Sequence, residues 1–470
     1  MPNIAHGRIA RMIRLFSHWC HWRPLAQALL DSAFVIVGIV IALMWSRHGL
    51  PIDHKQIVVF CLLLIAVAMS ISALLGVYQR IHRRTIIDGR TQALLAVYLS
   101  FPIAYALYIL LPLAPANPEL AQLSAMSAVF GLLVSRISTN ATNAGTSKHR
   151  ILVFGTGAKA LEVKRTLSRS DPAAEIVGFF AGPNENDSIL PRNQILSHYR
   201  TLTETALAAN VQEIVVALTE RRGGSMPLRE LLDCKLRGIR VLDLASHFEK
   251  TLGQIRLDSL YAGWLIFGEG FSQGYFRSFI KRVSDIFFSL ILLVVALPVM
   301  IITGLLIVLE DGLPIFYRQE RVGLNGRLFN VIKFRSMRCD AEKDGTPVWA
   351  TAADDRVTKV GRIIRRLRFD ELPQLFCVLK GDMSLVGPRP ERPFFADQLT
   401  KDIPFYAVRH SVKPGLTGWA QVCYHYGATI EDSAEKLQYD LYYVKNHSLF
   451  LDLVVLFETV GVVITGRGAH

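Results

Sequence analysis

Long apolar runs separated by short polar segments dominate the first 137 residues. Each run is close to the roughly 20 residues that a helix needs to cross the apolar part of a bilayer. The runs extend over 25–45, 57–78, 93–113 and 120–137. This pattern predicts an N-terminal bundle of four transmembrane helices at 1–137.

Basic residues are unevenly distributed among the loops of this predicted bundle. They cluster before the first run, after the second and after the fourth, whereas the loop after the third run has none. The clusters comprise Arg8, Arg11, Arg14, Arg23, Arg80, Arg83, Arg84, Arg90, Arg136, Lys148 and Arg150. Because cytoplasmic loops carry the excess of Lys and Arg, both ends of the bundle are expected in the cytoplasm. The first outer loop, with Arg47 and Lys55, runs against this pattern.

The pattern changes after a polar linker at 138–149. Short apolar runs now alternate with helical stretches, as in α/β domains that contain a parallel sheet. Strands are predicted at 151–154, 175–180, 213–218 and 238–244. They predict a small, doubly wound, Rossmann-like domain at 150–247, followed by a linker at 248–278.

The first of these strands runs into the sequence GTGAKA, which contains Gly155, Gly157 and Ala160. This is a degenerate form of the dinucleotide-binding fingerprint. The acidic residue expected after the second strand is missing, and the chain has no Tyr-x-x-x-Lys pair. A nicotinamide cofactor therefore stays an open alternative, whereas a tight turn with close helix–strand packing explains the glycines without a ligand.

A fifth apolar run covers 286–309 and is long enough to cross a membrane. Both of its flanks are basic, however, since residues 311–410 carry eighteen Lys and Arg against thirteen Asp and Glu. Pro298 lies in the middle of the run, and proline can bend a helix sharply. We therefore predict a re-entrant helix at 281–310 that leaves the membrane on the side it entered, with a kinked spanning helix as the alternative.

Composition agrees with a membrane protein that binds anions. Hydrophobic residues make up 51% of the chain, charged residues 19%, and the formal net charge is +13. Such a charge suits an anionic bilayer surface or phosphorylated ligands. Nucleic acid is not an expected partner, because zinc-finger spacings and aromatic ribonucleoprotein motifs are absent. The six cysteines form no CxxC pair, which indicates packing roles in a reducing compartment.

The candidate chemistry centres on Asp370 and Glu371 in the sequence RFDELPQL. Pro373 suits a first helical turn, so a helix is predicted to begin near 371–373, and acids are favourable at that end of a helix. Four arginines just upstream permit a second interpretation, a phosphate site. One carboxylate could then attack phosphorus, and the other could hold Mg²⁺.

Further basic residues stand on separate loops of the same region. Arginine offers a planar fork that matches two phosphate oxygens at once. Each of these residues taken alone is more often a solvated surface charge, but as a set they suit a diphosphate. The candidates are Arg318, Arg321, Lys333, Arg335, Arg365 and Arg389, the last held between two prolines.

The final segment begins with Tyr439, Asp440, Tyr442 and Tyr443 and ends in an apolar helix at 449–465. Aromatic residues beside a lysine suit a lipid headgroup boundary, and the helix could lie along the membrane interface. A plain core helix is the alternative.

Four motifs in this order, KFRSM, RFDELPQL, SLVGPRP and PGLTGWAQV, resemble the bacterial sugar transferase family. Its monotopic members are polyprenyl-phosphate glycosyl-1-phosphate transferases, and the resemblance covers a catalytic domain at 279–470. The spans and the α/β domain upstream resemble the long members that start exopolysaccharide or O-antigen repeat units. The implied fold is a four-helix membrane bundle, a Rossmann-like domain, and a re-entrant helix with a mainly α-helical catalytic domain and interfacial helices.

The resemblance also implies a reaction and its participants. Asp370 would attack the β-phosphate of a UDP-sugar and release UMP, and undecaprenyl phosphate would then take the phosphosugar. Glu371 would bind Mg²⁺, the implied cofactor, while Lys333, Arg335, Arg365 and Arg389 would hold phosphate groups. A homodimer with its site at the cytoplasmic face of the bacterial inner membrane is expected. Many members have Ser before the helix-bending proline, where this chain has Leu297.

Two other functions are open on the sequence. One is a membrane-anchored, NAD-dependent enzyme that modifies nucleotide sugars and uses the domain at 150–247. The other is a noncatalytic scaffold for polysaccharide assembly. The identity of the sugar does not follow from the sequence; glucose and galactose are the expectations that the resemblance suggests.

Overall fold

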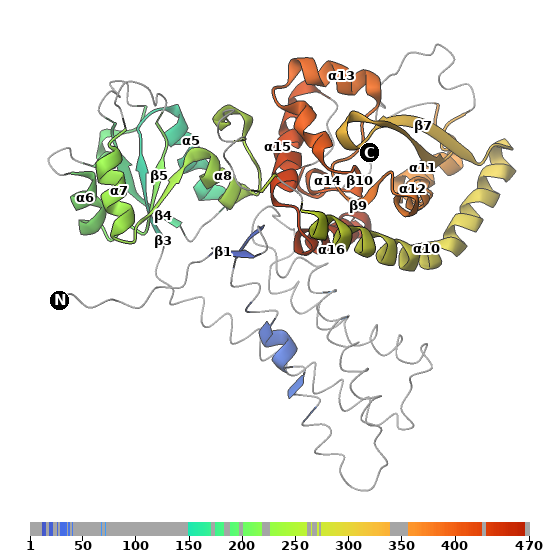
Figure 1. The fold of residues 1–470 in the computed structure, drawn as a ribbon, viewed down its shortest axis with the longest axis horizontal. Coiled ribbons are helices and arrows are strands. Elements are labelled where there is room, and N and C mark those ends of the chain that lie inside the picture. Colours follow the sequence, from blue (N-terminus) through green and yellow to red (C-terminus); the bar gives the residue numbers. More distant parts are fainter. Residues whose placement is uncertain are drawn as a thin grey trace, which may run out of the picture. The chain divides into compact units, whose positions relative to one another are not determined.

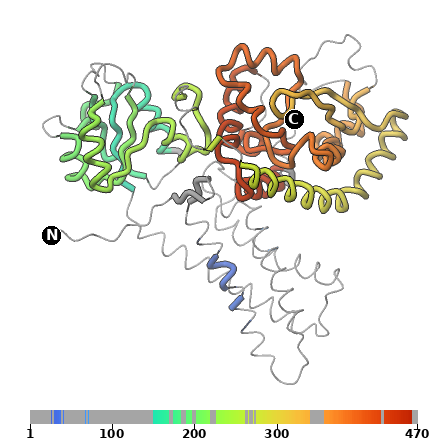
Figure 2. Tube along the Cα trace, in the orientation of Figure 1, coloured from blue at the N-terminus to red at the C-terminus, as the bar shows by residue number. Residues whose placement is uncertain are grey.

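The computed structural model describes residues 149–170, 174–182, 189–196, 201–218, 226–260, 274–338, 356–424 and 429–465, together with scattered residues between 12 and 71 and residues 265, 270 and 271. Two compact units are distinguished, and each is described by itself. We call the described part of 149–260 the middle unit and that of 261–470 the C-terminal unit (Figures 1 and 2). The predicted four-helix bundle lies almost wholly outside the described residues. Upstream, β1 (Met12–Leu15) and β2 (His18–His21) pair antiparallel.

The middle unit contains a parallel four-stranded sheet in the order β4-β3-β5-β6. Its strands are β3 (His149–Phe154), β4 (Ala174–Phe180), β5 (Glu213–Val216) and β6 (Arg240–Asp243). The helical elements are α5 (Ala158–Ser170), η1 (Arg192–Gln194), α6 (Leu202–Ala208), α7 (Leu228–Leu236), α8 (Leu244–Leu252) and η2 (Leu257–Ser259). All four predicted strands are therefore confirmed, although β5 and β6 are shorter than the apolar runs suggested.

Successive residues of β3 belong to different cores, as the strand period of two requires. Ile151 and Val153 pack in one apolar cluster with residues of α5 and α8. Leu152 and Phe154 pack in another with residues of α6 and α7. The near-continuous apolar sequence of the strand follows from burial on both faces.

Gly155, the first glycine of the fingerprint, is required by packing. Its φ is +133°, and a Cβ atom there would lie 2.7 Å from the carbonyl oxygen of Ala217. Only glycine fits such a conformation and such a close approach. The glycine is thus explained without a bound cofactor, in agreement with the second of the two interpretations.

The C-terminal unit is mainly helical. Its long helix α10 (Tyr275–Asp311) leads into the antiparallel hairpin of β7 (Phe316–Val322) and β8 (Leu328–Phe334), joined by η3 (Leu324–Gly326). Then follow α11 (Lys359–Arg366), η4 (Phe369–Glu371), α12 (Gln374–Lys380), β9 (Ser384–Val386), α13 (Pro393–Asp402), η5 (Tyr406–Ser411), β10 (Gly415–Thr417), α14 (Trp419–Cys423), α15 (Ile430–Asn446) and α16 (Leu449–Thr465). Strands β9 and β10 pair in parallel.

Helix α10 is, among the described residues, the one helix long and apolar enough to cross a membrane. Figure 1 shows that α10 is bent, and Pro298 lies inside the helix. A proline at this position removes one backbone hydrogen bond and pushes on the preceding turn. The bend lets α10 curve around the unit instead of running straight past it.

Both halves of α10 contact the C-terminal unit. In the first half, the Arg282 guanidinium donates hydrogen bonds to the carbonyl oxygens of Val378 and Leu379, both 2.6 Å away. In the second half, Met300 and Ile307 belong to the apolar cluster that includes residues of β8 and α11. The outer face of α10 leaves large apolar side chains exposed; examples are Val294, Val295, Ile301 and Leu305.

The tyrosines of α15 lie in the core. Tyr439, Tyr442 and Tyr443 are all buried, so the core interpretation is confirmed for them and the headgroup interpretation is wrong. Helix α16 is divided: Leu451 and Val455 are buried, whereas Phe457 and Val460 are exposed. Burial of the Tyr443 ring is compatible with its polar end, because its hydroxyl group donates to Asp452 inside the unit.

Candidate active site

The acid pair lies where the chain turns from α11 to α12. Arg368 adopts the left-handed conformation (φ 60°), which ends the helical region and starts the short turn η4. Helix α12 then begins at Gln374, with Pro373 as the preceding residue. The predicted start of a helix at this point is thus confirmed to within a few residues. Asp370 and Glu371 are only 8% and 7% exposed.

Glu371 is held by three cations from three separate segments of the chain. Its Oε1 lies 2.5 Å from Arg389 Nη2, 3.3 Å from Lys333 Nζ and 3.6 Å from Arg368 Nη1. Burial alone would raise the pKa of Glu371, but Arg389 and Lys333 hold this pKa well below its usual range. Glu371 is therefore an ionised, fixed anion.

Asp370 has the opposite surroundings. Its Oδ1 atom is buried and accepts no hydrogen bond within the described structure. Burial, and next the charge of Glu371, raise the pKa of Asp370 to about 6, against the opposing effect of Lys333 and Arg389. Two adjacent carboxylates with divergent pKa values are typical of catalytic pairs with separate roles.

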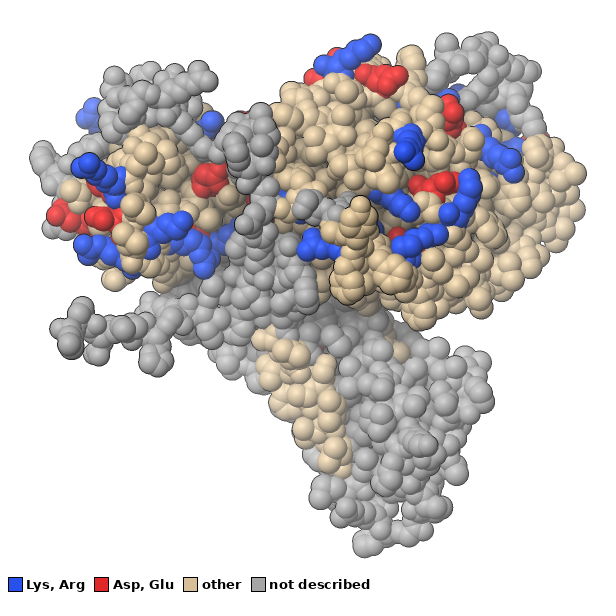
Figure 3. Space-filling model, in the orientation of Figure 1, with Lys and Arg blue, Asp and Glu red and all other residues tan. Residues whose placement is uncertain are grey.

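The β7–β8 hairpin presents Lys333 and Arg321 on one face. Lys333 lies opposite Tyr317 and Arg321 opposite Phe329 in the hairpin register, so the alternation of side chains places both cations on the same side. Arg321 donates a hydrogen bond to the carbonyl oxygen of Pro390, 3.1 Å away, and so supports the loop that carries Arg389. Figure 3 shows acidic side chains surrounded by Lys and Arg side chains on one face of the C-terminal unit.

Three predicted phosphate ligands have other surroundings. Arg318 is exposed and belongs to the other face of the hairpin. The Arg335 guanidinium donates to the carbonyl oxygens of Asp311 and Gly312, which fixes the end of α10. Arg365 is half-buried on α11, where its carbonyl oxygen accepts a hydrogen bond from the Arg368 N–H. Phosphate binding by these three residues stays a prediction.

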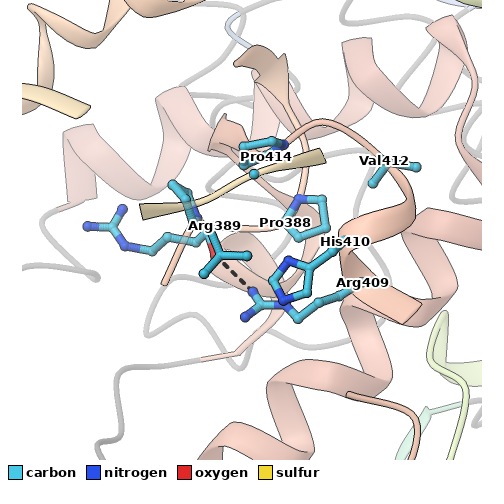
Figure 4. A pocket seen from close by; sticks show the side chains of 9 residues that line it. Pro388, Arg389, Arg409, His410, Val412 and Pro414 are labelled. Atoms are coloured by element: carbon cyan, nitrogen blue, oxygen red, sulfur yellow. Dashed lines mark hydrogen bonds between the residues drawn. The ribbon is translucent and has the colours of Figure 1, made fainter. Parts of the chain in front are cut away.

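Sequence reasoning missed a buried support behind Arg389. The Arg409 guanidinium donates to the Arg389 carbonyl oxygen (2.9 Å) and pairs with Asp440 (2.8 Å). Figure 4 shows the first bond beside a small hollow lined by Pro388, Arg389, Arg409, His410, Val412 and Pro414. No local pattern could have linked these residues, because Arg389, Arg409 and Asp440 are far apart in the sequence. The sequence shows Arg368 beside the acid pair but does not show that Arg368 forms an ion pair with Glu371.

A magnesium ion fits this site only together with a phosphate ligand. The described residues contain no group of three or more metal-ligating side chains. Mg²⁺ usually needs only one or two carboxylates, with water and substrate phosphates completing its shell. The unpartnered oxygen of Asp370 and the carboxylate of Glu371 are suitable, while Lys333 and Arg389 would disfavour a cation unless phosphate charge accompanied it.

The C-terminal unit thus joins an exposed apolar helix to a buried carboxylate pair surrounded by cations. A membrane-associated enzyme that transfers a phosphate-containing group is the class of protein that such a site defines.

Comparison with known proteins gives the family. Residues 276–466 match the family model described as "Bacterial sugar transferase". The chain is 31% identical over 324 residues to the UDP-glucose:undecaprenyl-phosphate glucose-1-phosphate transferase of Escherichia coli K12, covering 68% of each chain. The chain therefore belongs to the bacterial sugar transferase family, which confirms the resemblance seen in its motifs.

Two further relatives name another sugar. A UDP-N-acetylgalactosamine-undecaprenyl-phosphate N-acetylgalactosaminephosphotransferase of Aeromonas hydrophila is 44% identical over 242 residues, which cover 52% of this chain and 56% of the relative. A putative undecaprenyl-phosphate N-acetylgalactosaminyl 1-phosphate transferase of Bacillus subtilis is 55% identical over 130 residues, 28% of this chain and 72% of the relative. The chain thus spans about half the length of the first of these two. The comparisons do not favour the NAD-dependent enzyme or the scaffold.

Proposed function

We propose that this protein transfers a sugar-1-phosphate from a UDP-sugar to undecaprenyl phosphate and releases UMP. The single observation that carries the proposal is the asymmetry of the acid pair. Asp370 is buried without a hydrogen bond at Oδ1, and Glu371 beside it is fixed by cations. The first has the properties of a nucleophile, and the second those of an electrostatic anchor.

The reaction has two displacements at one phosphorus atom. An oxygen of Asp370 attacks the β-phosphorus of the UDP-sugar, the bond to the bridging oxygen breaks, and UMP leaves with that oxygen. A phosphate oxygen of undecaprenyl phosphate then attacks the same phosphorus and restores the Asp370 carboxylate. The products are UMP and undecaprenyl diphosphate sugar, and a covalent intermediate divides one difficult transfer into two easier steps.

The cations near the acid pair bind the phosphates. Lys333, Arg368 and Arg389 surround Glu371 in the described structure, and they can exchange part of this pairing for phosphate oxygens. Mg²⁺ held by Glu371, when bound, would neutralise the diphosphate and the departing UMP. The fixed cations need no rearrangement as charge develops, which is the main source of electrostatic catalysis.

A UMP-release assay with purified full-length protein tests this function. We expect UMP from one of UDP-glucose, UDP-galactose or UDP-N-acetylgalactosamine when undecaprenyl phosphate and Mg²⁺ are both present. Turnover should stop when the lipid phosphate is omitted. Failure to release UMP from any UDP-sugar, with the protein folded in a bilayer, would contradict the proposal.

The proposed location is the bacterial inner membrane, with the active site at the cytoplasmic face and four N-terminal spans. We further propose that α10 is re-entrant. The bend of α10, the proline inside it and the contacts of both halves of α10 with one unit support this, because a straight spanning helix would carry its ends to opposite membrane faces. Exopolysaccharide or O-antigen initiation and a homodimer remain predictions.

Thiol labelling gives a prediction for this topology. Ser278 and Arg327 are both exposed. In the sequence, Ser278 precedes the apolar part of α10, and Arg327, in the β7–β8 hairpin, follows it. In a variant whose six native cysteines are replaced, Ser278→Cys and Arg327→Cys should both resist a membrane-impermeant maleimide added to intact spheroplasts. Both should react in inside-out vesicles. Labelling of one of them from outside would instead indicate a spanning helix.

A further inference from the structure

Strand β9 is tied to α10 by two polar side chains one helical turn apart. Asp285 Oδ1 accepts hydrogen bonds from the Ser384 hydroxyl (3.0 Å) and from the Leu385 N–H (3.2 Å). The Lys281 ammonium donates to the carbonyl oxygen of Val386, 3.2 Å away. These bonds connect all three residues of β9 to the helix that carries the exposed apolar face.

A second apolar helix joins the same network. Asp452, in the first turn of α16, accepts a hydrogen bond from Lys281 (2.7 Å) and one from the Tyr443 hydroxyl (2.6 Å). The Tyr443 hydroxyl also lies 2.9 Å from the Val386 carbonyl oxygen. In Figure 1, α10, α16 and β9 lie close together, as their contacts require.

The chain from β9 to Arg389 has little freedom to absorb a displacement. Gly387 donates its N–H to the Thr417 carbonyl oxygen at 2.9 Å, and a Cβ atom on Gly387 would clash with the carbonyl oxygen of Lys413. Pro388 and Pro390 fix one backbone angle on each side of Arg389. A shift of Val386 would therefore move the Arg389 guanidinium relative to Glu371.

The polar character of this network also needs an explanation. The side chains of Asp285, Asp452 and Lys281 are 8%, 10% and 20% exposed, respectively. Taking such charges out of water is costly, and well-packed apolar residues in their place often stabilise a fold at least as much as a buried ion pair does. What the ion pair adds is direction, because its hydrogen bonds fix one geometry of the β9 backbone.

We propose that Lys281, Asp285 and Asp452 are positioning residues that hold Arg389 against Glu371 through strand β9. The inference rests on the proposed function, since it assigns these three residues to the same transfer reaction. None of them touches the acid pair, so their effect on the reaction passes through the loop 387–390.

Lys281→Met tests the proposal, with Lys380→Met as the matched control. Lys380 forms an ion pair of similar length with Asp382 (2.8 Å), but on the exposed surface of the same unit. We expect Lys281→Met to lower kcat for UMP release by about 10- to 100-fold, as a misplaced supporting group does. If Lys380→Met leaves kcat within about twofold of wild type, a nonspecific effect of losing one lysine charge is excluded. Lys281→Arg, which keeps the charge, should retain most of the wild-type activity.

Two measurements separate positioning from general destabilisation. In an Arg389→Lys background, Lys281→Met should cause no further loss of kcat, because the effects of coupled residues are not additive. A full additional loss would overturn the proposal.

Hydrogen exchange of the peptide 384–391 should accelerate in Lys281→Met and in Asp452→Asn, while exchange in α5 and β3 remains unchanged. Unchanged exchange at 384–391 would overturn it as well.

The exchange measurement does not depend on turnover. If the wild-type protein released no UMP from any UDP-sugar, the proposed function would fail while the exchange experiment still decided whether Lys281 holds β9. If wild-type turnover were normal and Lys281→Met matched Lys380→Met, the inference alone would fail.

Discussion

Asp370→Asn is expected to abolish UMP release, lowering kcat by about 10⁴-fold or more, as removal of a covalent nucleophile does. An amide has nearly the same shape as a carboxylate but does not form the acyl phosphate. Because Asp370 Oδ1 accepts no hydrogen bond in the described structure, the substitution should cost the fold little. The melting temperature of the variant should therefore stay near that of the wild type.

The same variant provides the covalent test. Wild-type protein incubated with the UDP-sugar but without undecaprenyl phosphate should accumulate a phosphosugar on the peptide that contains Asp370. Mass spectrometry of an acid-quenched digest would detect it, and the Asp370→Asn peptide should remain unmodified. An active wild-type enzyme with no adduct on residue 370, or a variant with retained turnover, would refute the nucleophile.

Glu371→Gln is expected to reduce kcat by about 10²- to 10³-fold, the range seen when one preorganised electrostatic group is removed. The amide would leave Lys333, Arg368 and Arg389 without their shared anion. More Mg²⁺ should be needed for half-maximal activity if Glu371 holds the ion. A magnesium titration identical to that of wild type would argue against this role.

The pH profile of Glu371→Gln has a defined direction. The pKa of Asp370 is about 6, and Glu371 is one of the groups that raise it. Wild-type kcat/KM should therefore fall as pH drops through about 6, since the carboxylate is the reactive form. Without the Glu371 charge, the cations lower the pKa of Asp370 and the acid limb should move to lower pH. Glu391→Gln is the control, because Glu391 is a nearby acid whose ion pair is with Arg321. A shift of the acid limb to higher pH in Glu371→Gln would contradict the assignment.

The sequence predicted elements whose signals are local. Strand β3 was predictable from four consecutive apolar residues, a pattern typical of a strand that is buried on both faces of its sheet. Helix α10 was predictable from a long apolar run with a single proline at its centre. The acid pair and Arg389 were recognisable from their motifs. These features depend on neighbours within a few residues.

Other features depended on register and on distant partners. Arg318 and Arg321 looked equivalent in the sequence, but the alternation of β7 places them on opposite faces. Nothing in the sequence indicated that the Arg335 guanidinium donates to the carbonyl oxygens at the end of α10; its phosphate role stays a prediction. The bond from Arg409 to Arg389 joins segments that only tertiary folding brings together, so no spacing rule reveals it.

The deep burial of Asp370 has a consequence for the lifetime of the proposed acyl phosphate. Acyl phosphates hydrolyse in water, and each hydrolysis would waste one activated sugar. Asp370 is only 8% exposed, so few competing water molecules reach it, and the acyl phosphate should persist until a slowly diffusing lipid acceptor arrives. The ratio of lipid-linked product to free sugar phosphate thus measures how well the burial of Asp370 protects the intermediate from water.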